Sequence, residues 1–190
     1  VEARRRTGYL PGDSSFYEAQ TGRAFLRDAL ADYPRVDRAL EAELLTTFAI
    51  PPDKRVPAYS HGMKRKIGII QALAPDVPVA ILDEPEEGLD PTARQKFLDV
   101  LRRLRARGKT IFLSSHQLDA VAQVCDRVAF LAAGKLVDCD SLASIRERAA
   151  RKIRVRLPSN ADPTALRVDG VAEVSARDGE FVVSCDGDPL

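Results

Sequence analysis

The stretch from Val79 to Asp90 constrains the fold more than any other part of this 190-residue sequence. Four apolar residues, VAIL, stand between Pro78 and two consecutive carboxylates, Asp83 and Glu84, and Pro85 follows them. A short apolar run bounded by prolines is typical of a strand that is buried on both faces of a parallel sheet. The segment therefore predicts an α/β fold in which helices flank such a sheet.

Asp83 and Glu84 at the end of this strand indicate more than a packing role. Ionised carboxylates are costly to bury unless a cation compensates them, and a bound metal ion would do so. Successive side chains of a strand point to opposite sides, so the two acids can have different tasks. One can hold Mg²⁺ through its oxygens, while the other orients or deprotonates a water molecule, as nucleotide hydrolysis requires. A strand that ends in a solvated acidic turn is the alternative interpretation of this stretch.

Ser60-His61-Gly62 is predicted to begin a helix that runs to about Ala74, just before Pro75. The first turn of a helix carries unpaired N–H groups and a partial positive charge, which suits a phosphate group. The Ser60 hydroxyl can add a hydrogen bond, and Gly62 lets the backbone approach a phosphate closely. Ser60 as an ordinary N-cap is the competing interpretation.

His116 follows a second predicted strand, Lys109 to Ser115. It therefore stands at the carboxyl end of that strand, where ligands bind in open α/β sheets. An imidazole can contact a phosphate or a water molecule in either of its charge states. Between the two strands, Asp90 and Pro91 predict the start of a helix that ends near Arg107.

The ordered motifs resemble those of the ATPase subunit of ATP-binding cassette (ABC) transporters: Ser-x-Gly, apolar-Asp-Glu-Pro, Gly-Leu-Asp-Pro and Ser-His. The resemblance covers residues 4 to 138. It implies a partial P-loop NTPase-like sheet flanked by helices, within an ABC ATPase domain over residues 1–150. A helical subdomain would occupy about residues 16–75, and residues 151–190 would form a small α+β accessory domain that ends abruptly.

The resemblance assigns a role to each matching residue. Asp83, in the Walker B segment, would hold the Mg²⁺ that accompanies ATP, Glu84 would activate or orient the attacking water, and His116 would fix the γ-phosphate. The signature segment would close on ATP held by a second subunit of a head-to-tail dimer, and Asp90 would help to couple the two sites. The signature residues are Ser60, His61 and Gly62.

Several positions depart from the family pattern. Gly12 stands where a glutamine normally reaches the metal and water, and His61 places a side chain at a position of close backbone approach. Glu86 and Glu87 add negative charge near the triphosphate, which is unfavourable unless it is screened. By resemblance, Phe16 to Thr21 would face the membrane partner. The basic residues after the signature segment are expected to form a solvated face: Lys64, Arg65 and Lys66.

The sequence contains no P-loop, the element that supplies the N–H cradle and the lysine for the β- and γ-phosphates. Gly108-Lys109-Thr110 imitates its end, but Arg103 occupies the position of the first glycine, and the segment is predicted to run from a helix to a strand. We therefore expect an N-terminally truncated chain whose 190 residues alone bind ATP weakly and do not hydrolyse it at a useful rate. The functional hypothesis concerns the parent protein.

The composition of the chain limits the kinds of partner that it is expected to have. The net charge of +1 gives no reason to expect a nucleic acid, and three cysteines without a CxxC pair favour reduced thiols. No apolar run approaches the roughly 20 residues of a membrane span, so work at a membrane would need a partner chain. By resemblance, that partner is a transmembrane permease, which would hold the cytoplasmic chain on the inner face of the cell membrane.

Three functional hypotheses follow. The first is an ATP-binding and ATP-hydrolysing subunit of an ABC transporter that powers export. The second is a non-hydrolysing, degenerate ABC partner or regulatory binding module, which Gly12, His61 and the missing P-loop favour. The third, a soluble ABC protein of DNA repair or translation, is disfavoured because the chain has neither long heptads nor a strongly basic tail.

Overall fold

The computed structural model describes residues 2–12, 20–150, 152–156, 163–167, 171–177 and 180–185. Contacts group the chain into two compact units, Val1–Val124 and Cys125–Leu190. The expected domain boundary after residue 150 falls inside the second unit, between α7 (Leu142–Ala150) and β6 (Lys152–Val155). Helix α7 contacts both β6 and the preceding strand β5 (Lys135–Ser141), which keeps these elements in one unit. None of the described helices is both long enough and apolar enough to cross a membrane.

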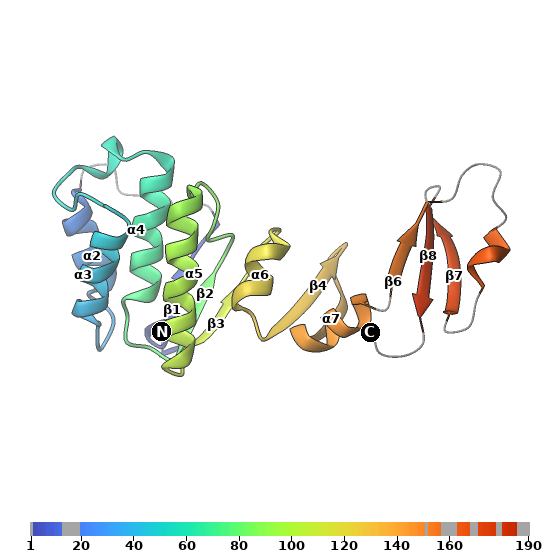
Figure 1. Ribbon diagram of the computed structural model, residues 1–190. Helices are drawn as coiled ribbons and strands as arrows, with labels where there is room; N and C mark the ends of the chain where they lie inside the picture. Colours follow the sequence, from blue (N-terminus) through green and yellow to red (C-terminus); the bar gives the residue numbers. More distant parts are fainter. Residues whose placement is uncertain are drawn as a thin grey trace. The chain divides into compact units, whose positions relative to one another are not determined.

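The first unit is built on a parallel three-stranded sheet in the order β1-β2-β3 (Figure 1). The strands are β1 (Thr7–Leu10), β2 (Val79–Leu82) and β3 (Thr110–Leu113). Leu10 pairs with Leu82, and Leu82 with Leu113, so the carboxyl ends of the strands lie level with one another. The predicted α/β class and the strand at Val79–Leu82 are confirmed.

The helices of this unit begin at short polar residues that cap them. Thr21 Oγ1 accepts a hydrogen bond from Ala24 N at 3.2 Å, and Ser60 Oγ accepts one from Met63 N at 3.3 Å, as in ordinary N-caps. Asp37 Oδ1 accepts a hydrogen bond from Leu40 N at 2.9 Å, and so caps the helix that begins at Arg38. The helices are α1 (Glu2–Arg5), α2 (Gly22–Leu30), α3 (Arg38–Thr47), α4 (His61–Leu73), α5 (Pro91–Ala106) and α6 (Leu118–Val124), with a short 3₁₀ turn at Val56–Ala58.

Helices α4 and α5 cover one face of the sheet (Figure 1). Gly8 of β1 shows how close this packing is, because a Cβ atom there would lie 1.9 Å from the carbonyl oxygen of Ala72 in α4. Large apolar side chains of the two helices are fully buried in the first unit. They include Ile67, Ile69, Ile70, Leu73, Phe97, Leu98 and Leu101.

The opposite face of the sheet carries a row of exposed apolar side chains. Tyr9, Ile81 and Phe112 occupy paired positions on the three strands and are 50%, 37% and 65% exposed. The prediction of a strand buried on both faces is therefore wrong for the first unit as described. The reason is that α4 and α5 pack on the face that Ala80 and Leu82 share, while the side chains of Tyr9, Ile81 and Phe112 on the other face stay exposed.

The second unit contains a hairpin and a small antiparallel sheet. Strand β4 (Arg127–Ala132) pairs with β5, and the sheet has the order β6-β8-β7, with β7 (Val171–Arg177) and β8 (Glu180–Cys185) antiparallel. A 3₁₀ turn spans Pro163–Leu166. Strands β7 and β8 pair from Val171 with Cys185 to Arg177 with Glu180, while residues 178 and 179 lie outside the described residues.

Candidate functional site

Polar side chains gather where β2 and β3 end. Asp83 and Glu84 follow β2, and Ser114 and His116 follow β3. Ser114 Oγ donates to Asp83 Oδ1 at 2.6 Å and accepts a hydrogen bond from Glu84 N at 2.9 Å. The Nδ1 atom of His116 lies 2.7 Å from Glu84 Oε2. The structure thus brings together the acids and the histidine that the motifs singled out.

The pairing of Glu84 with His116 defines which atoms remain open to a ligand. An ionised carboxylate only accepts hydrogen bonds, so the His116 Nδ1–H group is the donor and Nε2 is left for another partner. The side chain of His116 is 70% exposed and that of Glu84 is 36% exposed. Water and a small anionic ligand can therefore reach both groups.

The backbone of Glu84 is in the left-handed region, with φ of 45°. Residues other than glycine rarely adopt this conformation, and when they do the surroundings hold them there. The hydrogen bond from Glu84 N to Ser114 Oγ is one such restraint. The direction of the Glu84 side chain therefore depends on how this peptide is held.

The loop after β1 approaches the same acids. A Cβ atom on Gly12 would lie 2.9 Å from Asp83 Oδ2, so a side chain at this position would press against the carboxylate. Gly12 was expected to stand where the family has a glutamine, and it offers only backbone here. The segment expected to face a membrane partner, from Phe16 onward, lies outside the described residues up to position 19.

Glu86, one of the two acids that depart from the family pattern, has a buried side chain. It is only 3% exposed, and its Oε2 atom accepts a hydrogen bond of 3.0 Å from Ser115 Oγ. Its Oε1 atom is buried and has no hydrogen-bond partner among the described residues. Burial raises the pKa of Glu86, while the Ser115 bond and the charge of Arg94 oppose the rise and the charge of Glu84 adds to it. Its carboxyl group is therefore part of the interior, because the turn after β2 folds it inward.

The signature residues gather at the start of α4, against the turn that leads into α5. A Cβ atom on Gly62 would lie 2.7 Å from the carbonyl oxygen of Gly88, and one on Gly88 (φ 71°) would lie 2.7 Å from His61 Cδ2. Both glycines are thus required by this close approach. His61 is exposed on its outer side, and Ser60 caps the helix.

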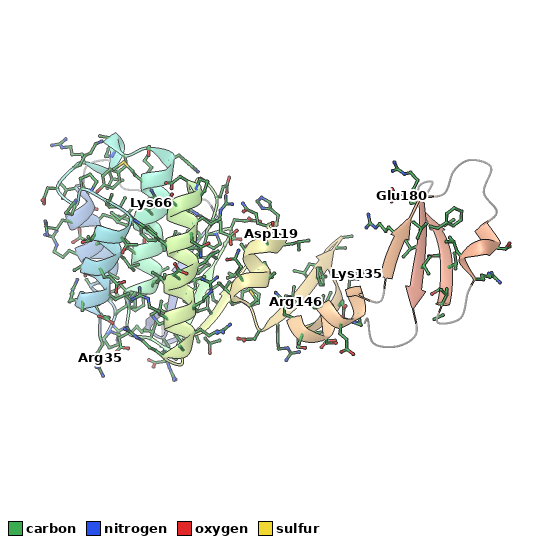
Figure 2. All side chains as sticks on the ribbon, viewed as in Figure 1. Arg35, Lys66, Asp119, Lys135, Arg146 and Glu180 are labelled. Carbon is green, nitrogen blue, oxygen red and sulfur yellow. The ribbon has the colours of Figure 1, made fainter. Side chains whose placement is uncertain are left out.

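Asp90 joins this second group of residues through Lys66, which extends from α4 (Figure 2). The Lys66 ammonium donates to Asp90 Oδ2 at 3.1 Å, and Asp90 Oδ1 accepts from Ala93 N at 2.8 Å as the cap of α5. The Ala93 N–H group, followed by Lys66, holds the pKa of Asp90 below its usual range. The expected capping role of Asp90 is confirmed.

Arg65 lies beside this site although the sequence did not predict it there. It was predicted on a solvated face, but it is 4% exposed, and Lys66 is engaged with Asp90. Ile69 and Ala72, four and seven positions further along α4, are fully buried, and this helical spacing places Arg65 on the buried face. That spacing was the available signal.

A magnesium ion fits this site only as one shared with a nucleotide. No group of three or more His, Cys, Asp or Glu side chains in the described part of the chain could hold a metal ion alone. Mg²⁺ in nucleotide sites is held by one or two carboxylates together with phosphate oxygens and water. Asp83 lies at the strand end with Ser114 beside it, and it can supply one such carboxylate.

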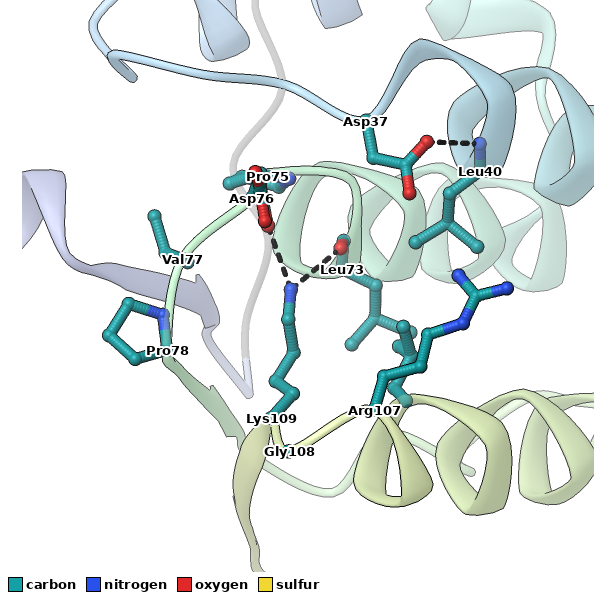
Figure 3. Close-up of a pocket in the computed structure, with 11 residues that line it drawn as sticks. Asp37, Leu40, Leu73, Pro75, Asp76, Val77, Pro78, Arg107, Gly108 and Lys109 are labelled. Atoms are coloured by element: carbon teal, nitrogen blue, oxygen red, sulfur yellow. Dashed lines mark hydrogen bonds between the residues drawn. The ribbon is translucent and has the colours of Figure 1, made fainter.

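The segment that imitates the end of a P-loop has a structural role instead. Gly108-Lys109 connects α5 to β3, and Lys109 Nζ donates to the carbonyls of Leu73 at 3.1 Å and Pro75 at 2.7 Å (Figure 3). Burial lowers the pKa of Lys109. The lysine borders a cavity of about 310 Å³ where β2 and β3 begin, which is the end of the sheet opposite to the acids. The rejection of a P-loop at this position is confirmed.

Comparison with known proteins adds the following findings. A family model described as "AAA domain, putative AbiEii toxin, Type IV TA system" matches residues 16–122. An uncharacterized ABC transporter ATP-binding protein of Nostoc sp. is 40% identical over 146 residues, which are 73% of this chain and 44% of that protein. A fluoroquinolones export ATP-binding protein of Mycobacterium tuberculosis is 35% identical over 138 residues, 69% of this chain and 46% of that protein.

Among solved structures, an ATP-binding subunit of an ABC transporter is similar with a TM-score of 0.68 and 32% identity, over 75% of this chain and 62% of that one. The chain spans less than half of the length of the two curated relatives, 44% and 46%.

Proposed function

The chain belongs to the ATP-binding cassette (ABC) family of ATP-binding proteins, and from this premise we propose that it is part of an ATP-hydrolysing subunit that powers export across a membrane. The observation that carries the proposal is the pairing of Glu84 with His116 at 2.7 Å, beside Asp83, at the carboxyl edge of a parallel sheet. Similarity to a protein named for export supports the direction of transport.

Each residue of this group has a part in the proposed hydrolysis. Glu84 accepts a proton from, or orients, the water that attacks the γ-phosphate. His116 receives its orientation from Glu84 through Nδ1–H, and in its protonated form it can also donate Nε2–H to a phosphate oxygen. Asp83 holds Mg²⁺, which supplies positive charge to the phosphate oxygens when it is bound with ATP. Ser114 holds both acids in place, because its hydroxyl donates to Asp83 Oδ1 and accepts from Glu84 N.

The second group of residues serves a second subunit in this proposal. The start of α4 presents Ser60, His61 and Gly62, and a helix start favours a phosphate. In a head-to-tail dimer it would close on the ATP of the partner, with Asp90 beside it. A transmembrane permease would complete the assembly and hold the subunit on the inner, cytoplasmic face of the membrane.

A substitution of Glu84 tests the proposed role. In the parent protein, Glu84→Gln is expected to abolish ATP turnover and to leave the Kd for ATP within about threefold, because the amide keeps the shape but not the basicity of the carboxylate. Glu87→Gln is the matched control, since Glu87 is an exposed acid of the same turn. Normal turnover by the Glu84 variant would refute the proposal.

A non-hydrolysing ABC partner or regulatory module is the second candidate function. The observation that favours it is Gly12, which lies against Asp83 and has no side chain to offer where the family has a glutamine. Such a module would place the start of α4 against the ATP of a partner subunit that can hydrolyse it. If the parent protein shows no turnover alone, but Gly62→Ala in it slows turnover by a competent partner subunit, this second function is the correct one.

A further inference from the structure

Arg65 makes hydrogen bonds from the interior of the first unit to two loops. Its Nη1 atom donates to the carbonyls of Pro11 at 2.8 Å and Gly12 at 2.9 Å. Its Nη2 atom donates to the carbonyls of Glu84, at 2.6 Å, and Asp83. One guanidinium group thus joins α4 to the loop after β1 and to the loop after β2.

Two of the carbonyls that Arg65 binds belong to the two acids, Asp83 and Glu84. Glu84 is held in the left-handed region from one side by Arg65, at its carbonyl, and from the other side by Ser114, at its N–H group. The conformation of this peptide sets where the Glu84 carboxylate meets His116. Gly12, at the other end of the guanidinium, lies against the Asp83 carboxylate.

The chemistry of the contact requires a guanidinium. Arginine presents five N–H donors in a rigid planar fork, whereas lysine presents one nitrogen on a flexible stem. A single ammonium cannot reach carbonyls on two separate loops with the same geometry. Carbonyl dipoles also compensate the buried charge of Arg65, which is only 4% exposed.

We propose that Arg65 is a positioning residue that couples the loop at Pro11-Gly12 to the carboxylate of Glu84. A displacement of either loop moves the guanidinium and therefore the other loop. Arg65 lies one helical turn after Gly62, so it also connects the start of α4 to the same peptides. The inference rests on the proposed role of Glu84 in ATP hydrolysis.

The test uses the parent protein and three variants. Arg65→Lys is expected to lower kcat for ATP hydrolysis about 10- to 100-fold, because a small misplacement of a catalytic group has an effect of that size. The Kd for ATP should stay within about threefold and the Tm within a few degrees. Lys64→Met, at the neighbouring basic residue, is the control and should change none of these values. Arg65→Gln, which buries no charge and is too short to join the two loops, is the second variant and should lower kcat similarly.

A double-substitution cycle distinguishes positioning from a merely structural role. In a protein that already carries Glu84→Gln, the Arg65→Lys change should cause no further loss of residual turnover, because the group it positions is gone. Normal kcat in a folded Arg65 variant would overturn the inference, as would an equal additional loss in the Glu84→Gln background. Failure of both Arg65 variants to fold would also overturn it in favour of a purely structural role. Normal turnover by the Glu84→Gln protein would instead refute the proposed function itself.

Discussion

Glu86 carries a buried carboxyl group whose two oxygens have different surroundings. Oε2 accepts a hydrogen bond from Ser115, while Oε1 is buried and has no hydrogen-bond partner among the described residues. A buried acceptor without a partner loses its hydration and gains nothing in return. The ionised form of Glu86 is therefore unfavourable in the folded state, and this is the physical cause of its raised pKa.

Replacement of Glu86 by glutamine is expected to stabilise the chain at neutral pH. Because the pKa of Glu86 is higher in the folded than in the unfolded state, the folded state binds more protons, and stability falls as pH rises above about 4.3, the ordinary pKa of this group. Glu86→Gln removes this loss, so its Tm at pH 7.5 should exceed that of the wild type by about 3 °C, or about 1 kcal/mol. The difference should shrink as pH falls towards about 4.

Thermal unfolding of both proteins between pH 4 and 8 measures this effect. The exposed neighbour Glu87, changed to glutamine, is the control and should show no such pH-dependent gain. A Glu86 variant that is less stable than the wild type at pH 7.5 would mean that the ionised carboxylate is compensated in the folded chain.

At the scale of elements, the distance between α4 and β1 is set by one glycine. The carbonyl oxygen of Ala72 occupies the space that a Cβ atom on Gly8 would need, at 1.9 Å. Since both sides of this contact are backbone, no side chain can move aside to make room. The contact also orients α4, whose other end carries Ser60 and Arg65.

Gly8→Ala is therefore expected to destabilise the first unit by about 3 kcal/mol, at the upper end of the range for overpacking. Chemical denaturation of the 190-residue chain measures the change. Gly108→Ala is the comparison, because nothing lies within 4 Å of its Cβ position, and only its φ of 89° opposes a side chain. That variant should lose about 1 kcal/mol. Equal losses would show that α4 can shift away from β1.

The same elements show what could be predicted from sequence. Caps such as Ser60 and Asp90 were predictable, because an N-cap is a local interaction between a polar side chain and an N–H group three residues later. The meeting of Glu84 with His116 followed from two parallel strands that end at one edge. Arg65 was not predicted, because its acceptors at Pro11 and Gly12 lie 54 and 53 positions away in the sequence. Such a partner becomes visible only when the tertiary fold is known.

At the scale of the whole molecule, the exposed face of the three-stranded sheet is the feature that predicts a further segment covering it. Parallel sheets are almost always covered on both faces, yet Tyr9, Ile81 and Phe112 form an exposed apolar row in the first unit. On its far side from β2, β3 pairs with no strand among the described residues. In the proposed function, a P-loop segment of the parent protein would supply both a strand for this edge and a helix for this face.

If this arrangement is correct, Phe112→Ser changes the free energy of unfolding by different amounts in the 190-residue chain and in the parent protein. In the 190-residue chain, where Phe112 is 65% exposed, the free energy of unfolding should change by no more than about 0.5 kcal/mol. In the parent protein, where a helix would bury this side chain, the loss should be about 3 kcal/mol or more. Phe97→Ala is the control, because Phe97 is fully buried and should cost about 3–5 kcal/mol in both proteins. An equally small effect of Phe112→Ser in both proteins would leave the face open in the parent, and the P-loop segment would then have to bind elsewhere.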